Sequence, residues 1–218
     1  MRRKSKEISV GKVKIGGENP IAVQSMLSLP SYEIEKNVKQ ADELKKAGCD
    51  ILRIAIPDIE AIKLIEKIKN KVDIPLVADI HFDYKLAVEA AFAGADKIRI
   101  NPGNIAKEKI KEVTKACQKN GIPIRVGVNS GSLEKYLAEN KDRAEAMVKS
   151  AMDNVKLLES LDFENIVISL KSSDVKTSVK AYKIAAEKCS YPLHLGVTET
   201  GTKFMGTIKS SVGIGSQI

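Results

Sequence analysis

The chain has 218 residues, of which 43% are hydrophobic and 29% charged, and it contains no tryptophan. No apolar run approaches the ~20 residues that a membrane span requires, and a strand pattern rather than an apolar segment follows the basic N-terminus, so we expect a cytoplasmic protein without a membrane partner. The net charge is +8, but lysines on predicted helices alternate with glutamates and no aromatic residues are interleaved with them. This pattern is typical of a solvated surface and disfavours a nucleic-acid partner.

The cysteines, Cys49, Cys117 and Cys189, are far apart and follow no spacing typical of a metal or cluster site. We interpret them as small apolar residues of a protein in a reducing compartment. The sequence therefore predicts no metal ligand on this chain.

In chain order, residues 7–16 come first and predict a β-hairpin with Gly11 at its centre. After it, short β-branched runs alternate with amphipathic helical patterns at a period of about 25 residues, which indicates βαβ units and a parallel sheet. The first helix is expected to stop at Gly48, and the third at Gly94. A final helix is expected after Thr202. The predicted strands are residues 21–26, 51–56, 75–81, 97–103, 123–129, 165–171 and 193–199.

This alternation predicts an α/β fold of the (β/α)8 TIM-barrel type, forming a single domain over residues 1–218. The common barrel closes with about eight strands, so the chain looks truncated after about seven units, with an open sheet edge. A doubly wound open sheet is the alternative. It ranks second because no predicted strand is followed by Gly-x-Gly-x-x-Gly at the start of a helix.

Polar side chains gather at the C-terminal ends of the predicted strands, where barrels of this type place their active sites. The candidates are Gln24, Ser25, Arg53, Asp79, His81, Arg99, Asn101, Asn104, Arg125, Asn129, Ser169, Lys171, Thr198 and Glu199.

The arginines of this group, Arg53, Arg99 and Arg125, are each flanked by aliphatic residues. A buried guanidinium group requires an anionic partner, and one interpretation is a set of internal ion pairs with Asp79, Asp50 or Asp96. Too few carboxylates share the predicted rim with the arginines and Lys171, however. The surplus positive charge favours an anionic ligand, and guanidinium groups match phosphate oxygens well.

The two histidines differ in position. His81 lies two residues after Asp79, on the same face of the strand, so that Asp79 could orient His81 toward a substrate; a histidine that only caps a loop is an equal alternative. These two residues and Glu199 are the candidates for catalysis. His194 begins the last predicted strand, at the end of the barrel associated with stability, and we expect it to be structural.

Several longer strings occur together: residues 23–26 (VQSM), 77–83 (VADIHFD), 98–104 (IRINPGN), 124–131 (IRVGVNSG), 169–172 (SLKS), 193–199 (LHLGVTE) and 206–211 (GTIKSS). From about residue 7 to the last residue, the chain resembles the diphosphate synthases that make 4-hydroxy-3-methylbut-2-enyl diphosphate. These enzymes reductively open 2-C-methyl-D-erythritol 2,4-cyclodiphosphate in the non-mevalonate (MEP) pathway of isoprenoid biosynthesis, with a barrel similar to that of dihydropteroate synthase.

The resemblance implies a diphosphate site and a substrate pocket. The expected diphosphate-binding residues are Arg53, Arg99, Arg125, Asn129 and Lys171, with Lys209 and Ser210 less directly. The expected pocket residues are Gln24, Ser25, Asn101 and Ser169.

The resemblance also implies an oxidoreductase with a [4Fe–4S] cluster, electrons from flavodoxin or ferredoxin, and a homodimer. The family holds the cluster with three Cys and one Glu in a C-terminal domain that these 218 residues do not contain, so we expect the chain alone to be inactive. Residues 27–31 (LSLPS) depart from the Thr/Asn-rich sequence usual after the first strand in the family. The remaining alternatives are a phosphate-binding barrel without redox chemistry, such as a pterin-type transferase, and a non-catalytic fragment that needs a partner chain.

Overall fold

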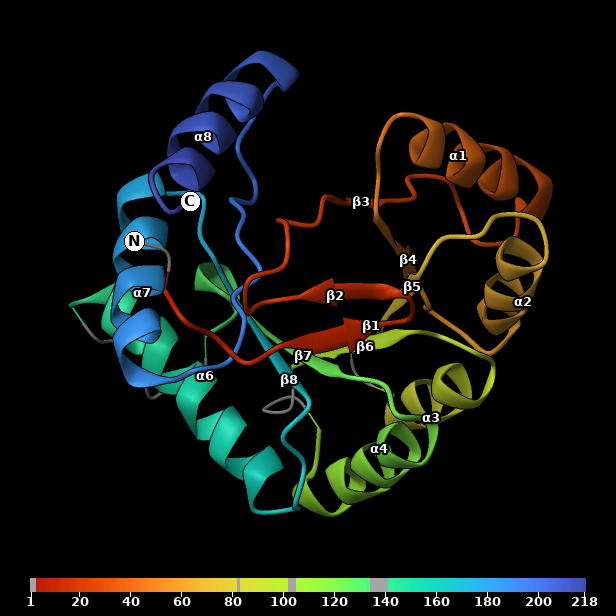
Figure 1. The fold of residues 1–218 in the computed structure, drawn as a ribbon, viewed down its shortest axis with the longest axis horizontal. Coiled ribbons are helices and arrows are strands. Elements are labelled where there is room, and N and C mark those ends of the chain that lie inside the picture. The colour runs from red at the N-terminus through yellow and green to blue at the C-terminus, as the bar shows by residue number, and fades with distance from the viewer. Residues whose placement is uncertain (1–2, 82, 102–104, 134–140) are drawn as a thin grey trace.

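The computed structural model describes residues 3–81, 83–101, 105–133 and 141–218. Its main sheet is parallel, and its strands follow one another in sequence order. Helices lie outside the curved sheet, which confirms the predicted TIM-barrel type of fold (Figure 1). The strands of this sheet are β3 (Gln24–Met26), β4 (Ile51–Ala55), β5 (Leu76–Asp79), β6 (Lys97–Ile100), β7 (Ile124–Asn129) and β8 (Ile166–Lys171).

Capping residues explain several of the helix boundaries. Asp142 and Asp174 accept hydrogen bonds from backbone N–H groups in the first turns of α6 and α7, and so cap these helices. Gly48 and Gly94, the predicted stops, have φ values of +93° and +95°, which side chains rarely adopt. No described helix is both long and apolar enough to cross a membrane. The helices are α1 (Ile34–Lys46), η1 (Glu60–Ile62), α2 (Lys63–Lys69), α3 (Tyr84–Phe92), α4 (Lys107–Asn120), η3 (Ser130–Ser132), α6 (Arg143–Glu159), α7 (Val175–Lys188) and α8 (Lys203–Gly215).

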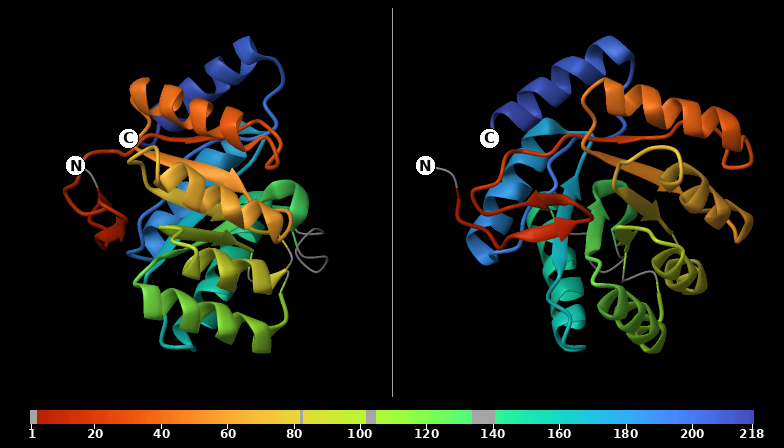
Figure 2. Two further views of the ribbon diagram at one scale, coloured as in Figure 1. Left: turned by 90° about the vertical axis from the view of Figure 1, so that its right-hand side faces the viewer. Right: turned by 45° about the vertical axis from the view of Figure 1, so that its right-hand side comes forward.

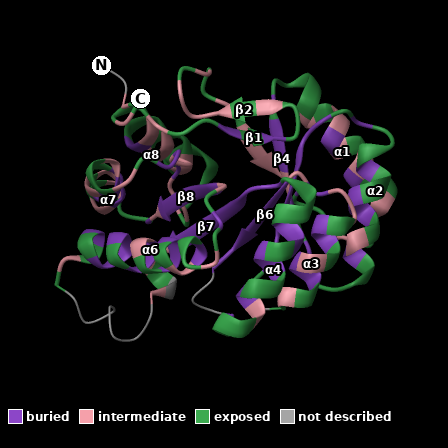
Figure 3. Cartoon of the chain, turned by 60° about the horizontal axis from the view of Figure 1, so that its bottom comes forward, coloured by how far each residue is buried: buried purple, intermediate pink, exposed green. Residues whose placement is uncertain are grey.

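The two faces of the sheet have different environments. Side chains alternate along each strand, and one set, which includes Leu52, Ile54, Ile98 and Ile100, packs with the helices in the main hydrophobic core. Figure 3 shows this packing as buried strands with helices that are buried on one side and exposed on the other. The other set of side chains faces the interior of the barrel, and this set contains the polar residues considered below.

An antiparallel hairpin, β1 (Ile8–Val10) and β2 (Val13–Ile15), covers one end of the barrel (Figures 1 and 2). Val10 is fully buried and packs with Ile51 and Val77, which lie near the starts of β4 and β5. Apolar side chains therefore cover the end where the strands begin, and most of the polar residues lie toward the end where the strands finish.

The predicted strand at residues 193–199 is wrong as a regular strand, since only an isolated bridge joins Leu193 to Ile168 of β8. The His194 N–H donates to the Ile168 carbonyl at 2.7 Å, as a parallel ladder would require. The next hydrogen bond of such a ladder, from the Leu170 N–H to the His194 carbonyl, is replaced by two bonds through the Tyr182 hydroxyl of α7. This hydroxyl accepts from the Leu170 N–H at 3.1 Å and donates to the His194 carbonyl at 2.5 Å. A side-chain hydroxyl thus occupies the place of a direct bond between the two segments.

We predict that Tyr182→Phe lowers the free energy of unfolding by about 1–3 kcal/mol, because a buried N–H and a buried carbonyl lose their partner. Chemical denaturation measures the change, and Tyr32→Phe, at a tyrosine that is 80% exposed, is the control. Equal stability of the Tyr182→Phe variant and the unmodified chain would mean that Leu170 and His194 pair directly and that the hydroxyl is dispensable.

Candidate functional site

The strand register brings most of the predicted polar residues to the interior face. Arg99 on β6 lies beside Arg125 on β7, and Asn129 on β7 lies beside Lys171 on β8. Aligned residues on neighbouring strands point to the same side of a sheet, so the pairings assign these side chains to one face. The predicted residues on that face are Gln24, Arg53, Asp79, Arg99, Arg125, Asn129, Ser169 and Lys171.

Asp79 is the carboxylate at the centre of this group. It is 3% exposed, and its Oδ1 lies 3.0 Å from Arg99 Nη1 while its Oδ2 lies 3.4 Å from Arg53 Nε. Arg53 also donates to the sulfur of Met26. The internal ion pairs considered from the sequence therefore exist for Arg99 and Arg53, which share one carboxylate.

The other predicted carboxylate partners are used elsewhere. Asp50 accepts a hydrogen bond from the Val23 N–H at 2.8 Å. Asp96 pairs with Lys69 and accepts from the Leu76 N–H. Within the described residues, neither aspartate forms a salt bridge with an arginine.

Arg125 has no carboxylate within salt-bridge distance in the described part of the chain, although it is only 2% exposed. Its Nη1 lies 3.2 Å from His194 Nε2, and its Nε has no hydrogen-bond partner among the described atoms. Burial, and then the positive charge of Arg125, hold the pKa of His194 well below its usual value, so His194 is neutral and accepts a hydrogen bond from Arg125. The structural role expected for His194 thus includes contact with a residue of the candidate site.

Two lysines, the buried Lys97 and the half-buried Lys171, join the arginines. Burial, followed by the charge of Arg125, lowers the pKa of Lys171 and that of Lys97 to about 7 each. Burial and the neighbouring arginines lower the pKa of Arg125 to about 9, which leaves it charged at neutral pH. In the described chain, neither lysine forms a salt bridge.

Lys97 was not a candidate from the sequence, because it stands at the start of its strand. Its spacing of two residues from Arg99 was the available signal, since such residues share a face. The interior thus holds more basic groups than acidic ones: the buried Lys97, Arg99 and Arg125 and the half-buried Arg53 and Lys171 lie around the carboxylate of Asp79.

His81 lies beside the aspartate at the exposed side of the group. Its Nε2 is 3.8 Å from Asp79 Oδ2, its Nδ1 is 3.5 Å from Arg99 Nη1, and its side chain is 61% exposed. Asn101 is 5% exposed and follows β6 directly. The structure therefore brings together Asp79 and His81, two of the three residues suggested for catalysis.

Other predicted residues lie apart from this group. Ser25 aligns with Leu52, whose side chain packs in the main core on the helix-facing side, so Ser25 does not share the face of Gln24. Lys209 and Ser210 lie on α8, which packs against α7. Glu199 is exposed and has a φ of +51°, a left-handed conformation uncommon for a side chain of its size. Asn104 lies outside the described residues.

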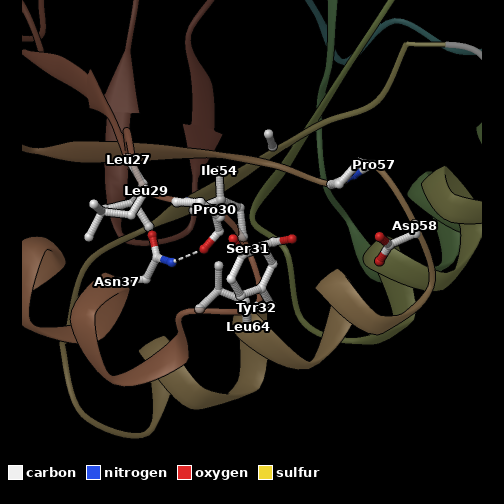
Figure 4. Close-up of a pocket in the computed structure, with 11 residues that line it drawn as sticks. Leu27, Leu29, Pro30, Ser31, Tyr32, Asn37, Ile54, Pro57, Asp58 and Leu64 are labelled. Atoms are coloured by element: carbon white, nitrogen blue, oxygen red, sulfur yellow. Dashed lines mark hydrogen bonds between the residues drawn. The ribbon is translucent and has the colours of Figure 1, made fainter.

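The segment 27–31, which departs from the family pattern, lines a pocket of about 370 Å³ next to the end of β4 (Figure 4). Leu27, Leu29 and Pro30 contribute apolar surface, together with Ile54 and Leu64. Segment 27–31 thus contributes mainly apolar side chains to this pocket.

Residues 5–218 match the model of a protein family described as the GcpE TIM-barrel domain. The chain belongs to this family. It is 54% identical over 219 aligned residues to a protein from Caldanaerobacter subterraneus subsp. tengcongensis, and 51% identical over 218 to one from Clostridium perfringens. Both relatives are named 4-hydroxy-3-methylbut-2-en-1-yl diphosphate synthase (flavodoxin), and the matches cover 99% of this chain but 62% of each relative. The chain thus spans about three fifths of the length of these curated relatives.

Solved structures with a similar fold come from other enzymes. A dihydropteroate synthase from Xanthomonas albilineans superposes with a TM-score of 0.62 at 13% identity, over 97% of this chain and 99% of that one. A 3-dehydroquinate dehydratase from Geobacillus kaustophilus gives 0.63 at 17% identity, over 94% and 83%. At these identities the likeness establishes the fold alone, and it agrees with the barrel expected from the sequence.

The residues present do not fit an iron–sulfur cluster. Cys49 and Cys117 are buried and Cys189 is half-buried, all three as free thiols. Burial raises the pKa of Cys117 to about 12 and also raises the pKa of Cys49, which opposes the thiolate form that a metal ligand needs. In the described ranges, no three His, Cys, Asp or Glu residues converge as metal ligands.

We predict opposite effects on stability from removing a lysine and from removing the aspartate. The pKa of Lys97 in the folded chain is about 7, below its unfolded value near 10.4, so the unmodified chain gains stability as the pH rises between these values. Lys97→Met should therefore stabilise the fold by on the order of 4 kcal/mol below pH 7, an advantage that disappears by about pH 10.

Asp79→Asn should instead lower the free energy of unfolding by about 3–5 kcal/mol, because Arg99 and Arg53 lose their shared counter-charge. Urea unfolding of both variants across this pH range measures the two effects. A Lys97→Met variant no more stable than the unmodified chain at pH 6 would contradict the presence of a costly buried charge.

Proposed function

We propose that this chain is the substrate-binding barrel of an enzyme that reductively opens 2-C-methyl-D-erythritol 2,4-cyclodiphosphate to 4-hydroxy-3-methylbut-2-enyl diphosphate. The observation that carries the proposal is the buried, uncompensated charge around Arg125, which is 2% exposed and has no carboxylate partner in the described chain. A buried cation without a counter-charge is costly, and a diphosphate would supply that charge. Membership of a family whose curated relatives bear the name of this synthase supports the choice of substrate.

In this proposal, the diphosphate is bound by Arg99, Arg125 and Lys171, with Arg53 and Asn129 beside them. Asp79 orients Arg99 and Arg53 through its two oxygens. Ring opening breaks a bond between a carbon atom and a diphosphate oxygen, which gains negative charge as the bond breaks. Cations already fixed around that oxygen would stabilise the developing charge without having to reorganise. Gln24, Asn101 and Ser169 are the candidates to contact the rest of the substrate, and His81 is the candidate to exchange a proton with it.

The electrons must come from groups other than the residues described here. The relatives' name specifies flavodoxin, and we propose a flavodoxin-type donor for the complete enzyme, with a [4Fe–4S] cluster held outside these residues. Because the proposed cluster lies outside these 218 residues, we expect them, tested alone, to bind substrate without reducing it. We also propose a homodimer, and a cytoplasmic location that suits the free thiols.

A phosphate-binding barrel of the pterin-transferase type remains the second candidate, although the likeness to dihydropteroate synthase supports only the fold. Calorimetric titration of the chain with the cyclic diphosphate and, separately, with a pterin that carries no phosphate discriminates between them. The proposal requires binding of the cyclic diphosphate and no binding of the pterin, and the reverse result would replace it with the transferase function.

We predict that Arg125→Met weakens binding of the cyclic diphosphate by about 1.5–3 kcal/mol, the value of hydrogen bonds to charged groups. Methionine retains part of the apolar volume, and loss of one clustered cation relieves repulsion, so the melting temperature should not fall. Lys188→Met, at an exposed residue at the end of α7, is the control for the loss of one positive charge. Unchanged affinity together with a lowered melting temperature would show that Arg125 is structural.

A further inference from the structure

Two glycines on the interior face lie directly beneath basic side chains. A Cβ atom added to Gly127 of β7 would stand 2.8 Å from Arg99 Nε and 3.2 Å from Arg99 Nη2. A Cβ atom added to Gly196, in the segment after β8, would stand 3.0 Å from Lys171 Cε and 3.2 Å from Lys171 Nζ. The 2.8 Å distance at Gly127 is shorter than real Cβ atoms show, and the 3.0 Å distance at Gly196 is tighter than nine in ten real Cβ contacts, so at each position the basic side chain would have to shift to make room for a methyl group.

Backbone conformation does not explain these glycines. Neither has a positive φ, whereas glycines such as Gly48 and Gly121 do. Both positions would accept an L-residue on conformational grounds, and glycine in a strand interior normally weakens the strand. The close approach of Arg99 and Lys171 is the remaining physical reason for glycine at these positions.

The two contacts follow one pattern. Arg99 belongs to β6 and lies over Gly127 of the next strand, two residues beyond its aligned partner Arg125 toward the C-terminal end. Lys171 belongs to β8 and lies over Gly196, in the segment that follows α7 and lies beside β8. Each cation therefore crosses to the neighbouring segment, and the guanidinium group of Arg99 is held from one side by Asp79 and from below by the bare backbone at Gly127.

We propose that Gly127 and Gly196 are positioning residues that determine diphosphate specificity, each acting as a notch that fixes one phosphate-binding cation, Arg99 or Lys171, in place across the barrel interior. The inference rests on the proposed function, because it assumes that these cations bind the substrate diphosphate. A methyl group in either notch would push the cation toward the centre of the barrel, into the volume that the anion needs. Binding would then fall even though every charged residue remained.

A double-mutant cycle tests the assignment, with inorganic pyrophosphate as the probe and its affinity measured by calorimetry. Gly127→Ala and Gly196→Ala should each weaken pyrophosphate binding by about tenfold or more, the value of one displaced charged hydrogen bond. In an Arg99→Met background the change at Gly127 should have no further effect, and in a Lys171→Met background the same should hold for Gly196. Gly215→Ala, at the end of α8 with open space at the Cβ position, should leave the affinity unchanged.

The outcomes distinguish a failure of the proposed function from a failure of the roles assigned to Gly127 and Gly196. If the unmodified chain binds no pyrophosphate, the proposed function is overturned, and the assignment of the notches falls with it. If the unmodified chain binds pyrophosphate and the alanine variants bind it equally well, the notches are refuted while the diphosphate site stands. Equal loss from alanine with and without the cation would identify the glycines as merely structural, which also refutes the proposal.

Melting temperatures are recorded for every variant. Should Gly127→Ala fail to fold, the cycle at Gly196 and Lys171 decides, because there the added methyl group meets the flexible end of a lysine.

Discussion

The interior of this barrel holds more positively charged than negatively charged side chains, and these cations repel one another. Arg99 and Arg53 share the carboxylate of Asp79, while Arg125 has no carboxylate within salt-bridge distance in the described chain and donates to a neutral histidine. Burial, followed by the positive charge of Arg125, lowers the pKa of Lys171 and that of Lys97 to about 7 each. A folded chain would avoid such a cluster if stability were the only requirement, since apolar residues of similar volume pack without the cost of desolvation. We therefore propose that the cluster is a site for an anion.

The rest of the fold holds this cluster in place. The hairpin covers the end where the strands begin, where Val10 packs with Ile51 and Val77, and most of the polar interior residues lie farther along the strands. Helices cover the outer face of each strand and fix the inward direction of the basic side chains. The Tyr182 hydroxyl joins the segment that carries His194 to β8, which places the histidine against Arg125. Stability and site geometry thus depend on the same few contacts.

Local pattern was enough to predict much of this arrangement. The alternation of strands and helices, the stops at Gly48 and Gly94 and the inward direction of Arg53, Arg99, Arg125 and Lys171 all follow from periodicity within short segments. The contact between Arg125 and His194 could not be predicted, because it joins residues 69 positions apart through the register of segments that the sequence does not specify. The interrupted ladder at residues 193–199 depends on a hydroxyl from a helix, and the different faces of Gln24 and Ser25 follow from the register of β3 with β4, which the sequence does not specify.

The central claim is that the basic groups in the barrel repel one another until an anion binds, and the protonation of Lys171 reports this directly. In a chain labelled with ¹³C at the lysine Cε, NMR titration follows each ammonium group, and Lys171→Met and Lys97→Met variants assign the two unusual signals. The account predicts that both lysines titrate near pH 7 in the free chain, and that pyrophosphate moves the pKa of Lys171 back toward the ordinary value of about 10.4. A Lys171 signal that titrates near pH 10 in the free chain, and that pyrophosphate leaves unchanged, would contradict it.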